Sequence, residues 1–175
     1  MSIQTVVERA RCEPPWEPPD APLPGALVCA VRAPVSWHKQ DIERAFGIKV
    51  PDEMVTLWDL CAGMLLYEDS EYGQSGLEVF APVDAVKVNR KYRDDDERAF
   101  AGDLVFGRFL GDLELAIFRT DQTATDCGTI VIAAEIDRRP KWYTAARSLE
   151  EFLVRFMDAK GEKYWVVRSA TRDRA

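Results

Sequence analysis

The strongest pattern of apolar and polar positions lies near the C-terminal end of the chain, in residues 148–161, SLEEFLVRFMDAKG. Its apolar positions recur at i, i+3, i+4, i+7 and i+8, which is one broad face of a helix. Ser148 and Glu151 form a capping box, in which each side chain can accept a hydrogen bond from the other's backbone N–H. Lys160 and Gly161 suit the end of a helix. We predict a helix that packs on a sheet, because only a sheet would bury so wide a stripe. The stripe consists of Leu149, Phe152, Leu153, Phe156 and Met157.

Two shorter helical patterns meet in residues 41–63, DIERAFGIKVPDEMVTLWDLCAG. Gly47 follows the first pattern, at the position where a helix ends most easily in the left-handed conformation. Pro51 suits the first turn of the second helix, and Asp52 and Glu53 then lie beside its positive N-terminus. We therefore predict two helices joined at a corner. Their apolar residues are Ile42, Ala45 and Phe46 in the first helix and Met54, Leu57, Trp58 and Cys61 in the second, which Gly63 ends.

The first helix of this corner is predicted to follow Ser36, a good N-cap, and to carry Trp37, His38 and Ile42. His38 is the only histidine of the chain. We interpret it as a surface or partly packed side chain, because a catalytic base also needs a nucleophile and an orienting partner within reach.

Short apolar runs predict strands in the second half of the chain. Two of them flank Gly111 and Asp112, a pair typical of a two-residue hairpin turn. Gly107, inside the first run, indicates a β-bulge or a close approach of another backbone. Together with a third run these segments predict an antiparallel meander. The three predicted strands cover residues 103–110, 113–118 and 129–135.

Other segments fit more than one structure. Residues 26–31 fit a strand or a helix, and residues 64–67 and 77–80 fit two strands around a polar loop, or one strand and a loop edge. From Pro82 onward the chain fits a helix with Val83, Val86 and Arg90 on one face, or a strand. The late segment GEKYWVVRS fits a final strand or a helix.

The N-terminal region is rich in proline. Residues 13–24, EPPWEPPDAPLP, contain six of the ten prolines, which exclude a regular helix or a central strand. We interpret residues 1–35 as an N-terminal arm, residues 36–168 as the folded domain and residues 169–175 as a flexible tail. Trp16 is expected to anchor the arm on the domain, and an aromatic-binding partner is the alternative.

Composition and charge narrow the classes of function. The chain has no apolar run near the roughly 20 residues of a membrane span and no secretory signal pattern, so a cytoplasmic protein is expected. Its net charge is −7, and residues 41–160 carry 15 basic against 24 acidic residues, a net charge of −9. This acidity disfavours nucleic-acid binding and favours a basic partner.

The motifs of common enzymes and metal sites are missing. Four scattered cysteines and one histidine do not have the spacing of a zinc site, and no cofactor is expected. P-loop, dinucleotide-binding, nucleophile-elbow and HExxH motifs are also missing. One enzymatic idea remains, a carboxylate pair on one face of a strand, Asp112 and Glu114. At a hairpin mouth in water these groups would stay ordinary acids, and turn formation explains Asp112.

Three motifs in order resemble the SUKH superfamily. They are D-I-E-x-A-F-G-I-K-V-P-D-E-M before an aromatic-bearing helix, the hairpin G-x-x-x-G-D-L-E-L-A-I-F-R-T-D, and S-L-E-E-F-L, and they extend over residues 36–160. The superfamily includes fungal regulators of cell-wall synthesis and many bacterial immunity proteins of polymorphic toxin systems. Two features depart from it: Ala62-Gly63 stands where members often have Asn-Gly, and the Pro-rich arm is not part of the family pattern.

The resemblance implies an α+β fold, a single domain with an antiparallel meander flanked by helices, and a non-enzymatic role in protein binding. Members of the superfamily neutralise toxins, often nucleases or deaminases, by covering an active site. The motif positions of this chain are interpreted as fold-setting, so they do not identify the binding surface. They are Gly47, Pro51, Trp58, Gly107, Gly111, Asp112, Asp121, Ser148, Phe152 and Leu153.

The leading hypothesis is therefore an immunity protein that binds a basic toxin domain. The alternatives are an intracellular scaffold or regulatory module that binds a cellular protein, and an enzyme that uses carboxylates. Contacts are expected in two acidic segments, of which the second, a run of four carboxylates, must be solvated and fits either a surface turn or a partner-binding patch. The expected contact residues are Glu68, Asp69, Glu71 and Tyr72 in the first segment and Asp94, Asp95, Asp96 and Glu97 in the second.

Overall fold

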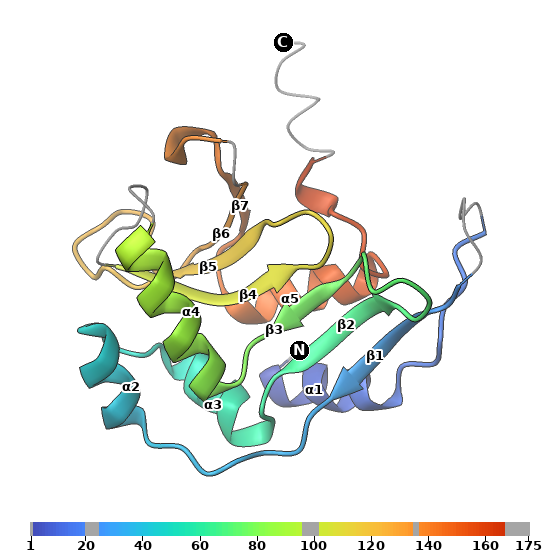
Figure 1. Ribbon diagram of the computed structural model, residues 1–175, viewed down its shortest axis with the longest axis horizontal. Helices are drawn as coiled ribbons and strands as arrows, with labels where there is room; N and C mark the ends of the chain where they lie inside the picture. The colour runs from blue at the N-terminus through green and yellow to red at the C-terminus, as the bar shows by residue number, and fades with distance from the viewer. Residues whose placement is uncertain (1, 20–24, 96–101, 135–136, 167–175) are drawn as a thin grey trace.

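A computed structural model describes residues 2–19, 25–95, 102–134 and 137–166. Seven antiparallel strands form one sheet in which each strand pairs with the next along the chain (Figure 1). The strands are β1 (Leu27–Val31), β2 (Met64–Asp69), β3 (Leu77–Val79), β4 (Asp103–Phe109), β5 (Leu115–Arg119), β6 (Ile130–Ala133) and β7 (Tyr143–Ala146). The helices are α1 (Ile3–Cys12), α2 (Lys39–Phe46), α3 (Asp52–Leu60), α4 (Pro82–Asp95) and α5 (Leu149–Asp158), with a 3₁₀ turn, η1 (Arg139–Lys141). The predicted α+β meander flanked by helices is confirmed.

Helices cover the two faces of this sheet. In Figure 1, α4 crosses in front of the sheet, whereas α1 and α5 lie behind it. Successive side chains of a strand point to opposite faces. Phe106 of β4 accordingly meets Phe152 of α5, with ring centroids 5.9 Å apart, while Asp103 of the same strand accepts a hydrogen bond from Tyr92 of α4.

The helix predicted near the C-terminal end is α5, and its five predicted apolar residues are all buried. Ser148 caps it as expected, because its hydroxyl accepts from the N–H of Glu151 at 3.0 Å. The reciprocal half of the capping box is wrong: the Glu151 carboxylate accepts from the N–H of Arg147, at 2.9 Å, and not from that of Ser148. The Glu151 carboxylate therefore binds the N–H one residue before the one that a capping box would use.

The corner of two helices is also present. Gly47 ends α2 with a φ of 63°, and its N–H donates to the carbonyl of Glu43 at 2.8 Å. The Glu43 carboxylate in turn accepts from the N–H of Val50 at 3.0 Å, which braces the corner. Pro51 occupies the N-cap of α3, one residue before the predicted place, and the helix ends at Leu60, before Gly63.

Ser36 is not the N-cap of α2, and that prediction is wrong. The helix begins at Lys39, and His38 stands at the N-cap without a side-chain bond to the helix. Trp37 explains the difference, because its indole N–H donates to Asp59 of α3 at 3.1 Å and its ring meets Trp58 edge-on. These tertiary contacts hold Trp37 outside the helix, against the local preference of Ser36.

Three of the segments that fitted more than one structure are strands: residues 26–31, 64–67 and 77–80 correspond to β1, β2 and β3. The chain from Pro82 onward is helix α4. The predicted face of α4 is wrong, since Val83 is 61% exposed. The buried face instead follows Ala85, Asn89 and Tyr92. Asn89 is fully buried; its amide donates to the carbonyls of Ala85 and Val105 and accepts from the N–H of Val105, at 2.7–2.8 Å. A polar residue therefore docks this helix, which an apolar pattern does not reveal.

For the hairpin of β4 and β5, the prediction about Gly107 is confirmed and the prediction of a two-residue turn is wrong. Gly107 lies at a register shift between the strands, and a Cβ there would be 2.6 Å from the carbonyl oxygen of Glu78, so both the bulge and the close backbone approach are present. The turn is longer than the two residues predicted, because the loop between the strands covers residues 110–114. Gly111 and Leu113 adopt positive φ values of 84° and 56° in it.

The N-terminal segment contains an element that the sequence did not predict. Ser2 caps α1, whose residues Ile3, Val6, Val7 and Ala10 are buried against α3, β1 and α5. Trp16 does anchor the following chain: its backbone exchanges two hydrogen bonds with Leu27, at 3.0 and 2.8 Å. The segment expected to be an arm thus contributes a core helix and the edge strand of the sheet. At the other end, residues 164–166 form a helical turn.

Glu53 links α3 to α5, and a substitution there tests this link. Its carboxylate accepts from the N–H groups of Leu149 and Glu150, at 3.1 and 3.0 Å. Replacing Glu53 with Ala should lower the free energy of unfolding by about 2 kcal/mol, since two N–H groups at a helix start lose their acceptor. Urea denaturation measures this. Asp52→Ala is the matched control, because Asp52 is 93% exposed; equal midpoints for the two variants would contradict the link.

Candidate functional site

The two acidic segments expected to bind a partner lie apart. Glu68 and Asp69 end β2, and Glu71 and Tyr72 belong to the β2–β3 loop, on the right of Figure 1. Asp94 is exposed near the end of α4, on the left of that view. The side chain of Asp95 and residues Asp96 and Glu97 lie outside the described part of the chain. The described parts of the two segments therefore do not form one continuous surface.

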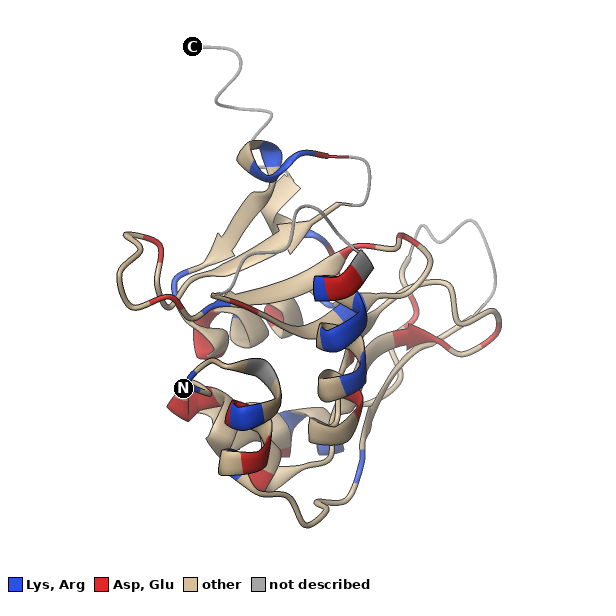
Figure 2. Cartoon of the chain, turned by 60° about the vertical axis from the view of Figure 1, so that its left-hand side comes forward, with Lys and Arg blue, Asp and Glu red and all other residues tan. Residues whose placement is uncertain are grey.

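The α4 segment is also less acidic than its carboxylates suggest. Figure 2 shows basic residues along the length of α4 up to its acidic end. These residues are Lys87, Arg90, Lys91 and Arg93. They offset the charge of Asp94, so the β2–β3 loop is the better candidate for attracting a basic partner.

The β2–β3 loop is ordered by its own hydrogen bonds. One oxygen of Asp69 accepts from the N–H groups of Glu71 and Tyr72, at 2.9 and 3.3 Å, and the N–H of Gly73 donates to the Asp69 carbonyl at 2.9 Å. Asp69 therefore shapes the turn. Tyr72 is 53% exposed, and within the described residues neither Glu68 nor Glu71 forms an ion pair. The loop presents free carboxylates beside an exposed aromatic ring.

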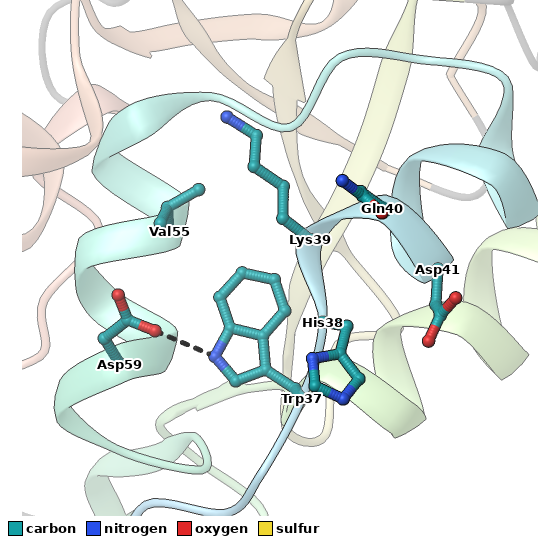
Figure 3. Close-up of a pocket in the computed structure, with 7 residues that line it drawn as sticks. All are labelled: Trp37, His38, Lys39, Gln40, Asp41, Val55 and Asp59. Carbon is teal, nitrogen blue, oxygen red and sulfur yellow. Dashed lines mark hydrogen bonds between the residues drawn. The ribbon is translucent and has the colours of Figure 1, made fainter.

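A second feature is a hollow of about 620 Å³ between α3 and the start of α2 (Figure 3). Trp37 lies at its centre, with its N–H on Asp59 and its ring at 75° to Trp58, 5.3 Å between centroids. Lys39 extends to Asp52 and Glu43. The lining residues are Trp37, His38, Lys39, Gln40, Asp41, Val55 and Asp59. The sequence pattern does not indicate this hollow, because its lining comes from a loop and from the exposed side of α3.

The motif positions lie at turns, caps and in the core. Trp58, Phe152 and Leu153 are fully buried. The carboxylate of Asp121 accepts from the N–H and the hydroxyl of Thr123, at 2.9 and 2.7 Å, and these bonds hold its pKa below the usual value. Gly47, Pro51, Gly107, Gly111 and Ser148 shape the corner, bulge, hairpin and cap described above.

The carboxylate pair considered for catalysis is engaged by a lysine. The ammonium of Lys163 lies 2.7 Å from Asp112 and 2.6 Å from Glu114, and 5.3 Å from the centre of the Phe109 ring. Burial lowers the pKa of Lys163, but the two carboxylate hydrogen bonds outweigh it and the pKa is raised overall. The arrangement fixes the hairpin against the chain after α5.

A buried charge cluster lies beneath the end of α4. Asp103, fully buried, pairs with Arg119 of the neighbouring strand and accepts two hydrogen bonds from Arg139, at 2.7 and 2.9 Å. Arg119 also donates to Asp126 at 2.9 Å, and this bond holds the pKa of Asp126 below its usual value. Sequence reasoning missed the cluster. Since its charges satisfy one another, we assign it to stability.

Two negative observations concern the described residues alone. No three histidine, cysteine, aspartate or glutamate side chains among them lie close enough together to hold a metal ion. No helix in that part of the chain has the length and hydrophobicity needed to cross a membrane.

Most of the chain matches the profile of a known protein family. The profile of the SMI1/KNR4 family (SUKH-1) matches residues 39–155, from the start of α2 into α5. The match contains the corner, strands β2 to β7 and most of α5, whereas α1 and β1 lie outside it. No curated protein matches the chain. The resemblance noted from the motifs is thereby confirmed, and the chain belongs to the SMI1/KNR4 family (SUKH-1).

Proposed function

We propose that this protein is a cytoplasmic immunity protein that binds a basic toxin domain, of nuclease or deaminase type, and neutralises it by covering its active site. Family membership supports the class, because SUKH proteins are commonly immunity proteins and generally non-enzymatic. The net charge of −9 in residues 41–160 supports a basic partner.

The observation that carries the proposal is the ordered acidic loop between β2 and β3. Its turn is held by Asp69, so little conformational entropy is lost when a partner binds. Tyr72 supplies the kind of exposed aromatic side chain that often dominates binding energy. Glu68 and Glu71 lie beside it without ion pairs to described residues, so a basic partner does not have to displace an existing cation.

Reversing the loop charges tests the proposal. The variant E68K/E71K should bind the cognate toxin about 30-fold more weakly, since attraction becomes repulsion at two positions. The loss should fall mainly on the association rate and shrink as salt is raised. Surface plasmon resonance against immobilised toxin measures both, and growth of toxin-expressing cells measures protection.

The matched control is E8K/D84K, which changes the net charge equally on α1 and at the start of α4. It should keep most of the affinity. Equal losses in the two variants would assign the effect to overall charge and remove the loop from the interface. Recovery of housekeeping proteins alone in a pull-down from native extract would favour a regulatory module over immunity.

A further inference from the structure

We propose that the hollow between Trp37 and α3 receives one cationic side chain, arginine or lysine, from the protein partner. This inference rests on the proposed function for the identity of the partner as a protein toxin. It adds a second contact point, separate from the β2–β3 loop, and states the chemistry of the residue that enters it.

The ring of Trp37 is held in place before any partner arrives. Its N–H donates to Asp59 at 3.1 Å, and its edge contact with the buried Trp58 fixes the ring from a second direction. Figure 3 shows the ring between Asp59 and His38, in the midst of the lining side chains. Because the ring is already fixed, the Trp37 side chain loses little conformational entropy when a cation stacks on it.

The charges around the ring favour a cation over an anion. Asp59 forms no ion pair with any described residue, and its second oxygen remains after the indole bond. Among the described residues, Asp41 forms an ion pair with Arg44 alone, at 3.5 Å, and the two side chains are 64% and 79% exposed. Exposed pairs of this kind exchange easily with another cation. The arginine or lysine side chain of the partner would therefore contact two carboxylates and a tryptophan.

Lys39 also lines the hollow, but its charge does not oppose a second cation. Lys39 extends its ammonium to Asp52, at 3.5 Å, and to Glu43, at 3.8 Å, so two carboxylates already offset its charge. Val55 gives the wall of α3 an apolar surface, against which the methylene groups of an arginine or lysine can lie. A volume of about 620 Å³ accommodates such a side chain.

A titration that does not need the toxin tests the site itself. The indole N–H signal of Trp37, assigned by its loss in Trp37→Leu, should shift when N-acetyl-arginine amide is added in the millimolar range, and should not shift with N-acetyl-glutamine amide. Asp59→Asn keeps an oxygen for the indole bond but removes the charge, and should weaken the arginine response about fivefold to tenfold. No shift, or equal shifts with both amides, would overturn the proposal.

The toxin then tests the biological role. Trp37→Leu should weaken toxin binding about 30-fold and Asp59→Asn about tenfold, whereas Asp84→Asn, with the same change of charge on α4, should bind as the parent does. If the parent binds the toxin and Asp59→Asn and Trp37→Leu bind equally well, this inference fails and the proposed function stands. If the parent does not bind the toxin, the proposed function fails, and the arginine titration still decides whether the hollow is a cation site.

Discussion

Replacing Asp103 with Ala should destabilise the protein by about 3–5 kcal/mol, because the change removes the fully buried carboxylate that Arg119 and Arg139 share. Asp103 is fully buried and is the shared partner of Arg119, which is 7% exposed, and of Arg139. It also accepts from the hydroxyl of Tyr92 at 3.1 Å, so the variant loses a link between α4 and the sheet. Urea denaturation at neutral pH measures the loss.

Asp126 provides the matched control for that prediction. It bonds to the same Arg119, but its side chain is 47% exposed, so Asp126→Asn should cost about 1 kcal/mol or less. The Arg119 hydrogen bond lowers its folded pKa below the ordinary 3.8. Its contribution is therefore present above that value and is lost as the pH falls through the folded pKa. A cost for Asp103→Ala as small as that for Asp126→Asn would contradict the burial argument.

The sequence located the hairpin of β4 and β5 but not the pairing at its far end. A turn at Gly111 and Asp112 predicts the register that the structure has next to the loop, where Gly107 faces Ala116. The bulge then shifts the pairing by one residue, and Asp103 faces Arg119 rather than Thr120. A glycine indicates that a bulge can occur, but not which way the register moves. The charge cluster follows from that shift, so it could not be predicted from the turn.

Local patterns predicted those elements whose apolar faces are continuous, such as α5 and α3. They did not predict α1, although its buried residues Ile3, Val6, Val7 and Ala10 have helical spacing. The prolines that follow it directed the interpretation of the whole segment toward an extended arm. For α4, the spacing of apolar residues predicted the wrong face, because the polar residue Asn89 makes the docking contacts of this helix. In α4, tertiary packing and not the spacing of apolar residues selected the buried face.

The candidate site was predictable only in part. The acidic β2–β3 loop could be placed from its sequence, since two apolar runs flank it. The hollow around Trp37 could not, because it depends on a bond between Trp37 and Asp59, 22 residues apart, that draws the chain before α2 toward α3. The same limit applies to Glu53, whose bonds to Leu149 and Glu150 join the first and last family motifs. Distant pairs of this kind leave no periodic signal in one sequence.

Replacing Trp58 with Ala should destabilise the protein by about 4–5 kcal/mol, since it opens a large cavity at a fully buried position. The variant also removes the indole donor of the Phe80 carbonyl, now bound at 2.9 Å. Trp58→Phe restores most of the volume but not that bond, and should cost about 1–3 kcal/mol. Thermal and urea denaturation of both variants separate the two contributions.

Trp142→Phe is the matched control, because the half-buried Trp142 also donates from its indole to a carbonyl, that of Asp137, at 3.1 Å. With water able to replace that bond, its loss should cost less than that of Trp58→Phe. The two variants should differ in a second way. Trp58 fixes the edge of Trp37, so Trp58→Phe should broaden the Trp37 indole signal and weaken its response to arginine, while Trp142→Phe should change neither. An unchanged Trp37 signal in Trp58→Phe would show that the bond to Asp59 alone orients the ring.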